Sequence, residues 1–142
     1  MFKKIAKSCF VLTLLFTHSL TSAAEIVVHP STPLQNLDEG QLRAIFSLQM
    51  TRWADGSPIV VLRLSATDPT HKSFCKDKLK ILPQQLEAVW ERLVFTGQRA
   101  RPLLMKNESE MMSAIASTPG AIGYIAGTQE HAVEIKMLPL RP

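Results

Sequence analysis

The sequence lacks the patterns that mark several common protein classes. It contains no run of basic residues interleaved with aromatic ones, which argues against a nucleic-acid-binding surface. His29, His71 and His131 do not share the spacing of metal ligands, and no paired acidic residues lie on one face of an expected helix. No repeat or low-complexity tract occurs. We therefore expect no nucleic-acid partner, no metal or other cofactor, and no catalytic activity.

The first 24 residues have the three-part pattern of a secretory signal peptide. Three lysines lie among the first seven residues, residues 9–20 are largely apolar, and residues 22–24 are small, as expected before a cleavage site at Glu25. An uncleaved membrane anchor is the weaker alternative, because the apolar run is shorter than the roughly 20 residues that cross a bilayer. We expect a periplasmic or secreted protein with no membrane insertion after cleavage.

Cysteine and net charge are both scarce in residues 25–142. The whole chain has 16 basic and 12 acidic residues, and the segment 1–24 removes three of the basic ones and none of the acidic ones. Only Cys75 remains after Cys9 is removed, which excludes an intramolecular disulfide. We expect Cys75 to be buried, and a reactive or dimer-forming thiol is the alternative. The length of residues 25–142 fits a single domain with one hydrophobic core.

Hydrophobic periodicity predicts strands alternating with helices over residues 25–142. Strands are expected at residues 25–29, 58–64, 121–125 and 132–138, with a brief extended piece at 102–105. Helices are expected at residues 37–48, 69–80, from 83 to just before Gly97, and from 108 onward. The third of these helices has the clearest apolar stripe, formed by Leu86, Val89, Trp90, Leu93 and Val94. This order predicts a compact α/β sandwich.

Local signals predict how some of these elements begin and pack. Asn36 and Glu39 have the spacing of a capping box at the start of the first helix. Asp68 is expected to cap the second helix, with Pro69 at its first position. Gly123 lies within an expected strand, where we expect another stretch of backbone to pass close.

Residues 58–78 join an expected strand to an expected helix through a polar turn. Free N–H groups at a helix start, a guanidinium and hydroxyl groups are the components that bind phosphate or sulfate in proteins. The turn therefore predicts an anion-binding site. Its candidate residues are Arg63, Ser65, Thr67, Asp68, Thr70 and His71, together with Ser31 and Thr32 in the loop after the first strand, which we expect near the same strand ends. His71 could add positive charge below pH 6.5.

Several stretches together resemble the phosphate-binding proteins of periplasmic ABC transporters. They are IVVHP at 26–30, QLRAIFSL at 41–48, Trp53, PIVV at 58–61 and PGAIGY at 119–124. WERLVFTG at 90–97 is similar to small single-lobe members of this group. The resemblance covers nearly all of residues 25–142. It implies one lobe of a type 2 periplasmic binding protein, with a mixed sheet of about four or five strands flanked by helices, where a full receptor closes two such lobes on its ligand.

The resemblance also implies where an anion would bind. In the family, an Arg follows the second strand, and an Asp-Gly-Ser-Gly-Thr turn begins the next helix, whose N–H groups hold the oxyanion. In this sequence Asp68 matches the Asp of that motif, Pro69 and His71 replace its two glycines, and Arg63 matches the Arg only with a shift of a few residues. Pro69 removes an N–H donor and a side chain at His71 blocks close approach, so we expect an altered site.

Two functions are compatible with these observations. The first is an exported protein that binds phosphate or another oxyanion, related to the substrate-binding component of phosphate ABC transport, with a weak or altered anion site. The alternative is a ligand-free interaction module, in which Asp68 is an ordinary helix cap and Arg63 a salt-bridge partner. A second copy of the chain or a transport partner would then take the place of the second lobe, with Arg99 and Arg101 as contact positions.

Overall fold

A five-stranded mixed sheet forms the centre of the molecule. The computed structural model describes residues 23–127 and 134–142; the predicted signal peptide lies outside these ranges except for its last two residues. The strand order β4-β3-β5-β1-β6 uses β1 (Ala24–Val28), β3 (Val60–Arg63), β4 (Leu103–Leu104), β5 (Ala121–Ala126) and β6 (Lys136–Leu138). β3 is parallel to β4 and β5, whereas β1 is antiparallel to β5 and β6. The predicted α/β fold with a mixed sheet is confirmed.

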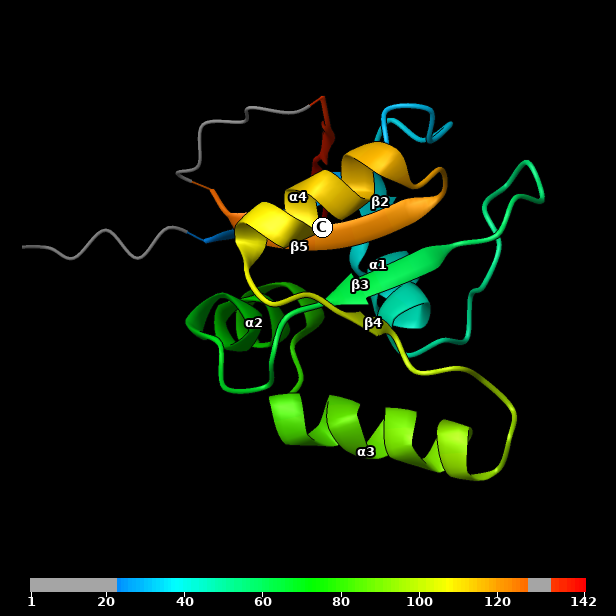
Figure 1. The fold of residues 1–142 in the computed structure, drawn as a ribbon, viewed down its shortest axis with the longest axis vertical. Helices are drawn as coiled ribbons and strands as arrows, with labels where there is room; N and C mark the ends of the chain where they lie inside the picture. Colours follow the sequence, from blue (N-terminus) through cyan, green and yellow to red (C-terminus); the bar gives the residue numbers. More distant parts are fainter. Residues whose placement is uncertain (1–22, 128–133) are drawn as a thin grey trace, which may run out of the picture.

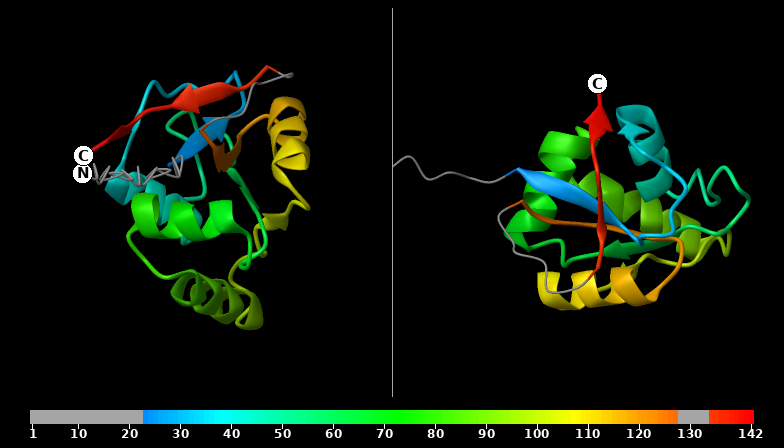
Figure 2. Two further views of the ribbon diagram at one scale, coloured as in Figure 1. Left: turned by 90° about the vertical axis from the view of Figure 1, so that its left-hand side faces the viewer. Right: turned by 90° about the horizontal axis from the view of Figure 1, so that it is seen from above.

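Helices cover both faces of this sheet (Figures 1 and 2). α4 (Glu108–Ser117) lies on one face, and α1 (Glu39–Phe46), α2 (Pro69–Ser73) and the π-helical turn η1 (Phe74–Leu79) lie on the other. α3 (Pro83–Phe95) lies farther out, and its Trp90 Nε1 donates to the carbonyl of Phe46 at 2.7 Å. Within the described residues, no helix is long and apolar enough to cross a membrane.

The core is built from the strands and the inner helix faces. An aromatic group lies at its centre, where the rings of Phe74 and Tyr124 stack at 4.0 Å and Phe46 meets Phe74 edge-on at 4.7 Å. A Cβ added at Gly123 would collide with the side chains of Met111 and Ile115. The close neighbour that the sequence predicted at Gly123 is therefore α4, through its side chains, and not another backbone.

The first helix begins later than predicted. Leu37 and Asp38 form the short strand β2 (Leu37–Asp38), which pairs with β7 (Leu140–Arg141). Asp38 is the actual cap: its carboxylate accepts from Gln41 N at 2.7 Å, and the side chain of Gln41 accepts from Asp38 N at 3.1 Å. The predicted capping box of Asn36 and Glu39 is wrong by two residues, because the pairing with β7 keeps residues 37 and 38 extended.

Other boundaries differ in detail. The second predicted helix is two elements, since α2 gives way to η1, which ends at Lys80 in a left-handed conformation with φ 57°. Leu86 and Trp90 of α3 are buried as predicted, but Val94 is 40% exposed. The last predicted strand is shorter than expected: residues 132 and 133 lie outside the described ranges, residues 134 and 135 are not in a strand, and only β6 forms, at the edge of the sheet.

Candidate functional site

The carboxyl ends of β3, β4 and β5 lie together on one side of the sheet. This side is called an edge below, although it is formed by strand ends and not by an outer strand. β3 ends at Arg63, and a polar turn at residues 65–68 leads from Leu64 into α2. β4 leads within four residues into α4, and β5 ends at Ala126 beside them. The carboxyl ends of these parallel strands and the N-termini of α2 and α4 therefore share one edge, which is where α/β sheets place ligands. The structure brings the predicted residues of segment 63–71 to this edge.

The turn itself is held together by its own polar groups. The hydroxyl groups of Ser65 and Thr67 lie 3.0 Å apart, and the backbone N–H of Thr67 donates to the Ser65 hydroxyl at 3.4 Å. The N–H of Asp68 donates to the carbonyl of Ser65 at 3.0 Å. Ser65 and Thr67 are exposed. Their hydroxyl groups are therefore the parts of the turn that a ligand in solution can reach.

Asp68 caps α2, as predicted. Its carboxylate oxygen Oδ1 accepts from Thr70 N at 2.8 Å and from His71 N at 3.4 Å, and Pro69 occupies the first helical position without an N–H group. The first N–H groups of α2 are thus satisfied within the protein. An oxyanion at this helix start would have to compete with a carboxylate already in place.

A second carboxylate, that of Glu108, reaches the same edge from the start of α4. One of its oxygens accepts from the Thr70 hydroxyl at 2.5 Å, and the other accepts from Ala126 N at 3.0 Å. Glu108 thereby joins α2 to the end of β5. Glu108 was not among the residues predicted from the sequence, where its only signal was its place at the start of a predicted helix.

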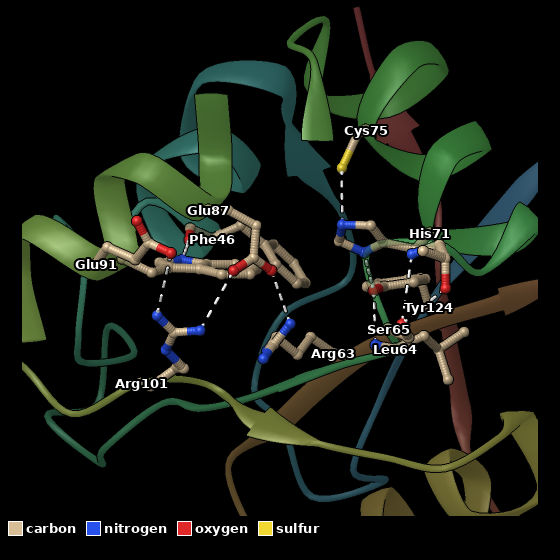
Figure 3. Close-up of polar contacts among 12 residues, drawn as sticks. Phe46, Arg63, Leu64, Ser65, His71, Cys75, Glu87, Glu91, Arg101 and Tyr124 are labelled. Carbon is tan, nitrogen blue, oxygen red and sulfur yellow. Dashed lines mark hydrogen bonds and ion pairs between the residues drawn. The ribbon is translucent and has the colours of Figure 1, made fainter. Parts of the chain in front are cut away.

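Arg63 points toward α3 and is paired there (Figure 3). It is 7% exposed, its Nη1 donates to Glu87 Oε1 at 2.8 Å, and its guanidinium lies 5.3 Å from the centre of the Trp90 ring. Arg101 donates to the other oxygen of Glu87 at 3.3 Å. The charge of Arg63 is therefore neutralised by a third internal carboxylate.

His71 is fully buried beneath the turn, so it does not reach a ligand in solution. Its Nδ1 lies 2.5 Å from the Tyr124 hydroxyl, and its Nε2 lies 3.5 Å from the Cys75 sulfur (Figure 3). Burial, reinforced by the charge of Arg63, lowers the pKa of His71 to about 4. The expectation that His71 charges below pH 6.5 is therefore wrong for the folded protein.

Cys75 is buried, as expected from the sequence. Burial, reinforced by the charge of Glu87, raises the pKa of its thiol to about 12. The thiol therefore stays protonated at neutral pH, and its burial keeps it from pairing with a second chain. Within the described residues, no group of three or more His, Cys, Asp and Glu side chains could hold a metal ion.

Ser31 and Thr32 lie at the opposite edge of the sheet. They follow β1, which is antiparallel to β5, and His29 N donates to the carbonyl of Ala121 at the start of β5. Ser31 and Thr32 therefore line a hollow with Trp53, Pro58 and Gly120. The expectation that they lie near Arg63 is wrong, because the direction of β1 carries them to the other end of the strands.

A hollow of about 380 Å³ opens between the turn and α3. Thr67 and Lys72 line one side of it, and Glu87 and Glu91 of α3 line the other. Lys72 is exposed. Among the described residues, this hollow offers an anion the Thr67 hydroxyl, with the Ser65 hydroxyl beside it, and the Lys72 ammonium group, and two carboxylates line its other side.

Comparisons with known proteins agree with this architecture. A family model described as a PBP superfamily domain matches residues 20–136, whereas no curated protein matches the sequence. The chain is similar to an ABC-type phosphate transport receptor from Vibrio cholerae, with 21% identity over 84% of this chain and 47% of that one and a TM-score of 0.62. It is also similar to PstS from Borrelia burgdorferi, with 19% identity, the same coverage and a TM-score of 0.62. The chain spans about half the length of these structures.

Proposed function

The chain belongs to the PBP superfamily, and from this premise we propose that it is an exported lobe of the phosphate-binding type whose anion site is weak because the protein's own carboxylates fill it. Export rests on the signal-peptide pattern of residues 1–24. Phosphate is the first anion to consider, because the similar structures include a phosphate transport receptor.

The observation that carries the proposal is the set of hydrogen bonds made by Asp68, Glu87 and Glu108. These carboxylates accept from the α2 N–H groups, from the Arg63 guanidinium and from the Thr70 hydroxyl. Such groups are the donors that an oxyanion uses at a strand end followed by a helix. An incoming anion would have to displace the carboxylates or bind beside them against their charge.

The donors left for an external anion are exposed. Among the described residues of the turn and of α2, they are the hydroxyl groups of Ser65 and Thr67 and the ammonium group of Lys72, whose residues are exposed to solvent. Exposed charge pairs contribute roughly 0–1 kcal/mol each, so binding near or weaker than a Kd of about 1 mM is expected for the isolated lobe.

Calorimetric titration of residues 25–142 with phosphate and with sulfate tests this function. We expect weak binding that Lys72→Gln reduces further, while Lys76→Gln, an exposed lysine of η1 outside this hollow, leaves it unchanged. Arg63→Ala should change the affinity little, because Glu87 already holds the guanidinium. Micromolar binding would contradict the weak site, and no saturable binding by the wild-type protein would favour the interaction module.

The interaction module remains a second candidate because apolar side chains are exposed. Leu103 and Leu104 on the edge strand β4 are 53% and 55% exposed, and Phe95 at the end of α3 is 93% exposed. Exposed apolar edge strands favour pairing with another chain. Light scattering over a concentration series would reveal a dimer, and Leu103→Lys should weaken it. A monomer at all concentrations would remove self-association from this candidate.

A further inference from the structure

The only tyrosine of the chain, Tyr124, contacts both ends of the candidate anion turn. Its hydroxyl oxygen accepts from the backbone N–H of Leu64 at 2.9 Å, and the same hydroxyl lies 2.5 Å from His71 Nδ1. Leu64 precedes the turn, and His71 lies in the first turn of α2. One atom of β5 therefore ties Leu64, before the turn, to His71, in the helix that follows it (Figure 3).

The direction of each hydrogen bond follows from the donors present. The Leu64 N–H can only donate, so the Tyr124 hydroxyl accepts from it. Of the two hydrogen-bond partners of this buried hydroxyl, only His71 Nδ1 can accept, so the hydroxyl hydrogen is paired when it points to Nδ1. Nδ1 is then the unprotonated nitrogen of a neutral ring, and the proton resides on Nε2, which faces the Cys75 sulfur at 3.5 Å. Burial raises the pKa of Tyr124, so its hydroxyl keeps its hydrogen.

The ring that carries this hydroxyl is held rigidly. It stacks on Phe74 with an angle of 7° between the planes, lies 5.9 Å from the ring of Phe46, and is fully buried within β5. Buried polar groups that are all paired in this way restrict a structure to one arrangement. The position of the hydroxyl is therefore set by the core and not by the exposed turn.

We infer that Tyr124 is the positioning residue of the candidate site: its hydroxyl fixes the span of residues 65–70 by holding Leu64 and His71 against β5. That residues 65–70 form an anion site rests on the proposed function. That Tyr124 positions these residues does not require that they bind an anion.

The wild-type protein offers the first test, by ¹⁵N NMR of the histidine side chains at neutral pH. We expect one histidine, assigned to His71 by its loss in His71→Asn, to be neutral with its proton on Nε2 alone. The Leu64 amide should exchange its hydrogen more slowly than the Thr67 amide, whose donor lies in the exposed turn. A protonated Nδ1, or a mixture of tautomers as in free histidine, would overturn the inference.

The second test removes only the hydroxyl, in Tyr124→Phe. Trp53→Phe is the control, because it removes a buried hydrogen bond, from Trp53 Nε1 to the Gly120 carbonyl, together with part of the ring, at the opposite edge of the sheet. Loss of the hydroxyl should speed hydrogen exchange of the Leu64 amide about tenfold and shift the amide signals of residues 65–70. The control should leave these signals unchanged. Equal changes in both variants would mean that Tyr124 acts only through general stability.

A phosphate titration followed by the same amide signals separates this inference from the proposed function. If phosphate shifts no signal in the wild-type protein, the anion site fails while the tautomer and exchange results still decide the role of Tyr124. If Tyr124→Phe does not fold, the wild-type tautomer and amide exchange decide it alone.

Discussion

At the edge where β3 and β5 end, side-chain carboxylates accept from the helix and strand N–H groups, whereas at the opposite edge a backbone carbonyl accepts from the buried Trp53 ring and from Val60 N. Asp68 and Glu108 accept from α2 and from Ala126 at the first edge. At the second edge the carbonyl of Gly120 accepts both from Val60 N at 3.0 Å and from the Trp53 ring at 3.1 Å. The first edge therefore depends on charge and pH, and the second depends on backbone geometry.

Gly120→Ala should disrupt the opposite edge, where the Gly120 carbonyl is the acceptor, and should have the largest effect on stability. Gly120 has φ 82°, and an added Cβ would collide with the carbonyl oxygen of Pro58. We expect the free energy of unfolding, measured in urea, to fall by at least about 3 kcal/mol, from left-handed strain plus this collision. Gly97→Ala is the control, since Gly97 has φ 70° but open space around it, and should cost about 1 kcal/mol. Equal losses would show that the Pro58 contact is unimportant.

Acid should weaken the edge that carries the candidate site, through His71. The pKa of His71 is about 4 in the folded protein and 6.5 for an unperturbed histidine, as in the unfolded chain, so between these values the unfolded chain binds a proton that the folded protein does not. The contribution of His71 to the free energy of unfolding is therefore fully present above pH 6.5 and is lost as the pH drops toward 4, by about 3 kcal/mol in total. The hydrogen-bonding groups that face His71 are the Tyr124 hydroxyl and the Cys75 thiol, and the charges that act on its pKa are those of Arg63 and Asp68.

Urea unfolding between pH 4 and 7 measures this dependence. In His71→Asn, an amide oxygen can replace Nδ1 as the acceptor for Tyr124 and does not titrate. The variant should therefore lack the fall of about 3 kcal/mol in the free energy of unfolding that His71 causes in the wild-type protein as the pH drops. If both proteins lose stability equally across this range, His71 is not the group responsible.

Glu87→Gln tests whether the pairing of Arg63 stabilises the fold. The side chain of Arg63 is only 9% exposed, and without Glu87 its charge would lack its closest partner, so we expect a loss of about 2 kcal/mol in the free energy of unfolding. Glu91→Gln is the matched control on the same helix. Glu91 is 69% exposed and lies 3.9 Å from Arg101, so its loss should stay below about 0.5 kcal/mol. A Glu87→Gln effect as small as that of the control would contradict the pairing.

The sequence predicted the parts of this site that depend on neighbouring residues. Asp68 caps α2 two and three positions away, so its role followed from local spacing. The partners Thr70 and Glu108 are 38 positions apart, and Arg63 and Glu87 are 24 apart, so only the packing of the helices brings them together.

The wrong prediction for the loop after β1 has a different cause. Strand patterns in the sequence predict that a segment is extended but not the direction in which it enters the sheet. Because β1 is antiparallel to β5, Ser31 and Thr32 lie at the far edge. The prediction of the fold class is correct despite this error, because the alternation of strands and helices predicts the layers and not the orientation of each strand.

The central claim, that internal carboxylates weaken the anion site, is tested most directly by phosphate titration of Glu108→Gln. This change removes one negative charge beside Thr70, and the single amide oxygen of Gln can still accept one of the two hydrogen bonds that Glu108 accepts, from the Thr70 hydroxyl or from Ala126 N. Glu39→Gln is the matched control, because Glu39 is likewise the first residue of a helix, α1, but takes no part in the hydrogen bonds described at this edge. We predict that Glu108→Gln binds phosphate about tenfold more tightly than the wild-type protein, and that Glu39→Gln changes the affinity less than about twofold. Unchanged or weaker binding by a folded Glu108→Gln protein would contradict this claim.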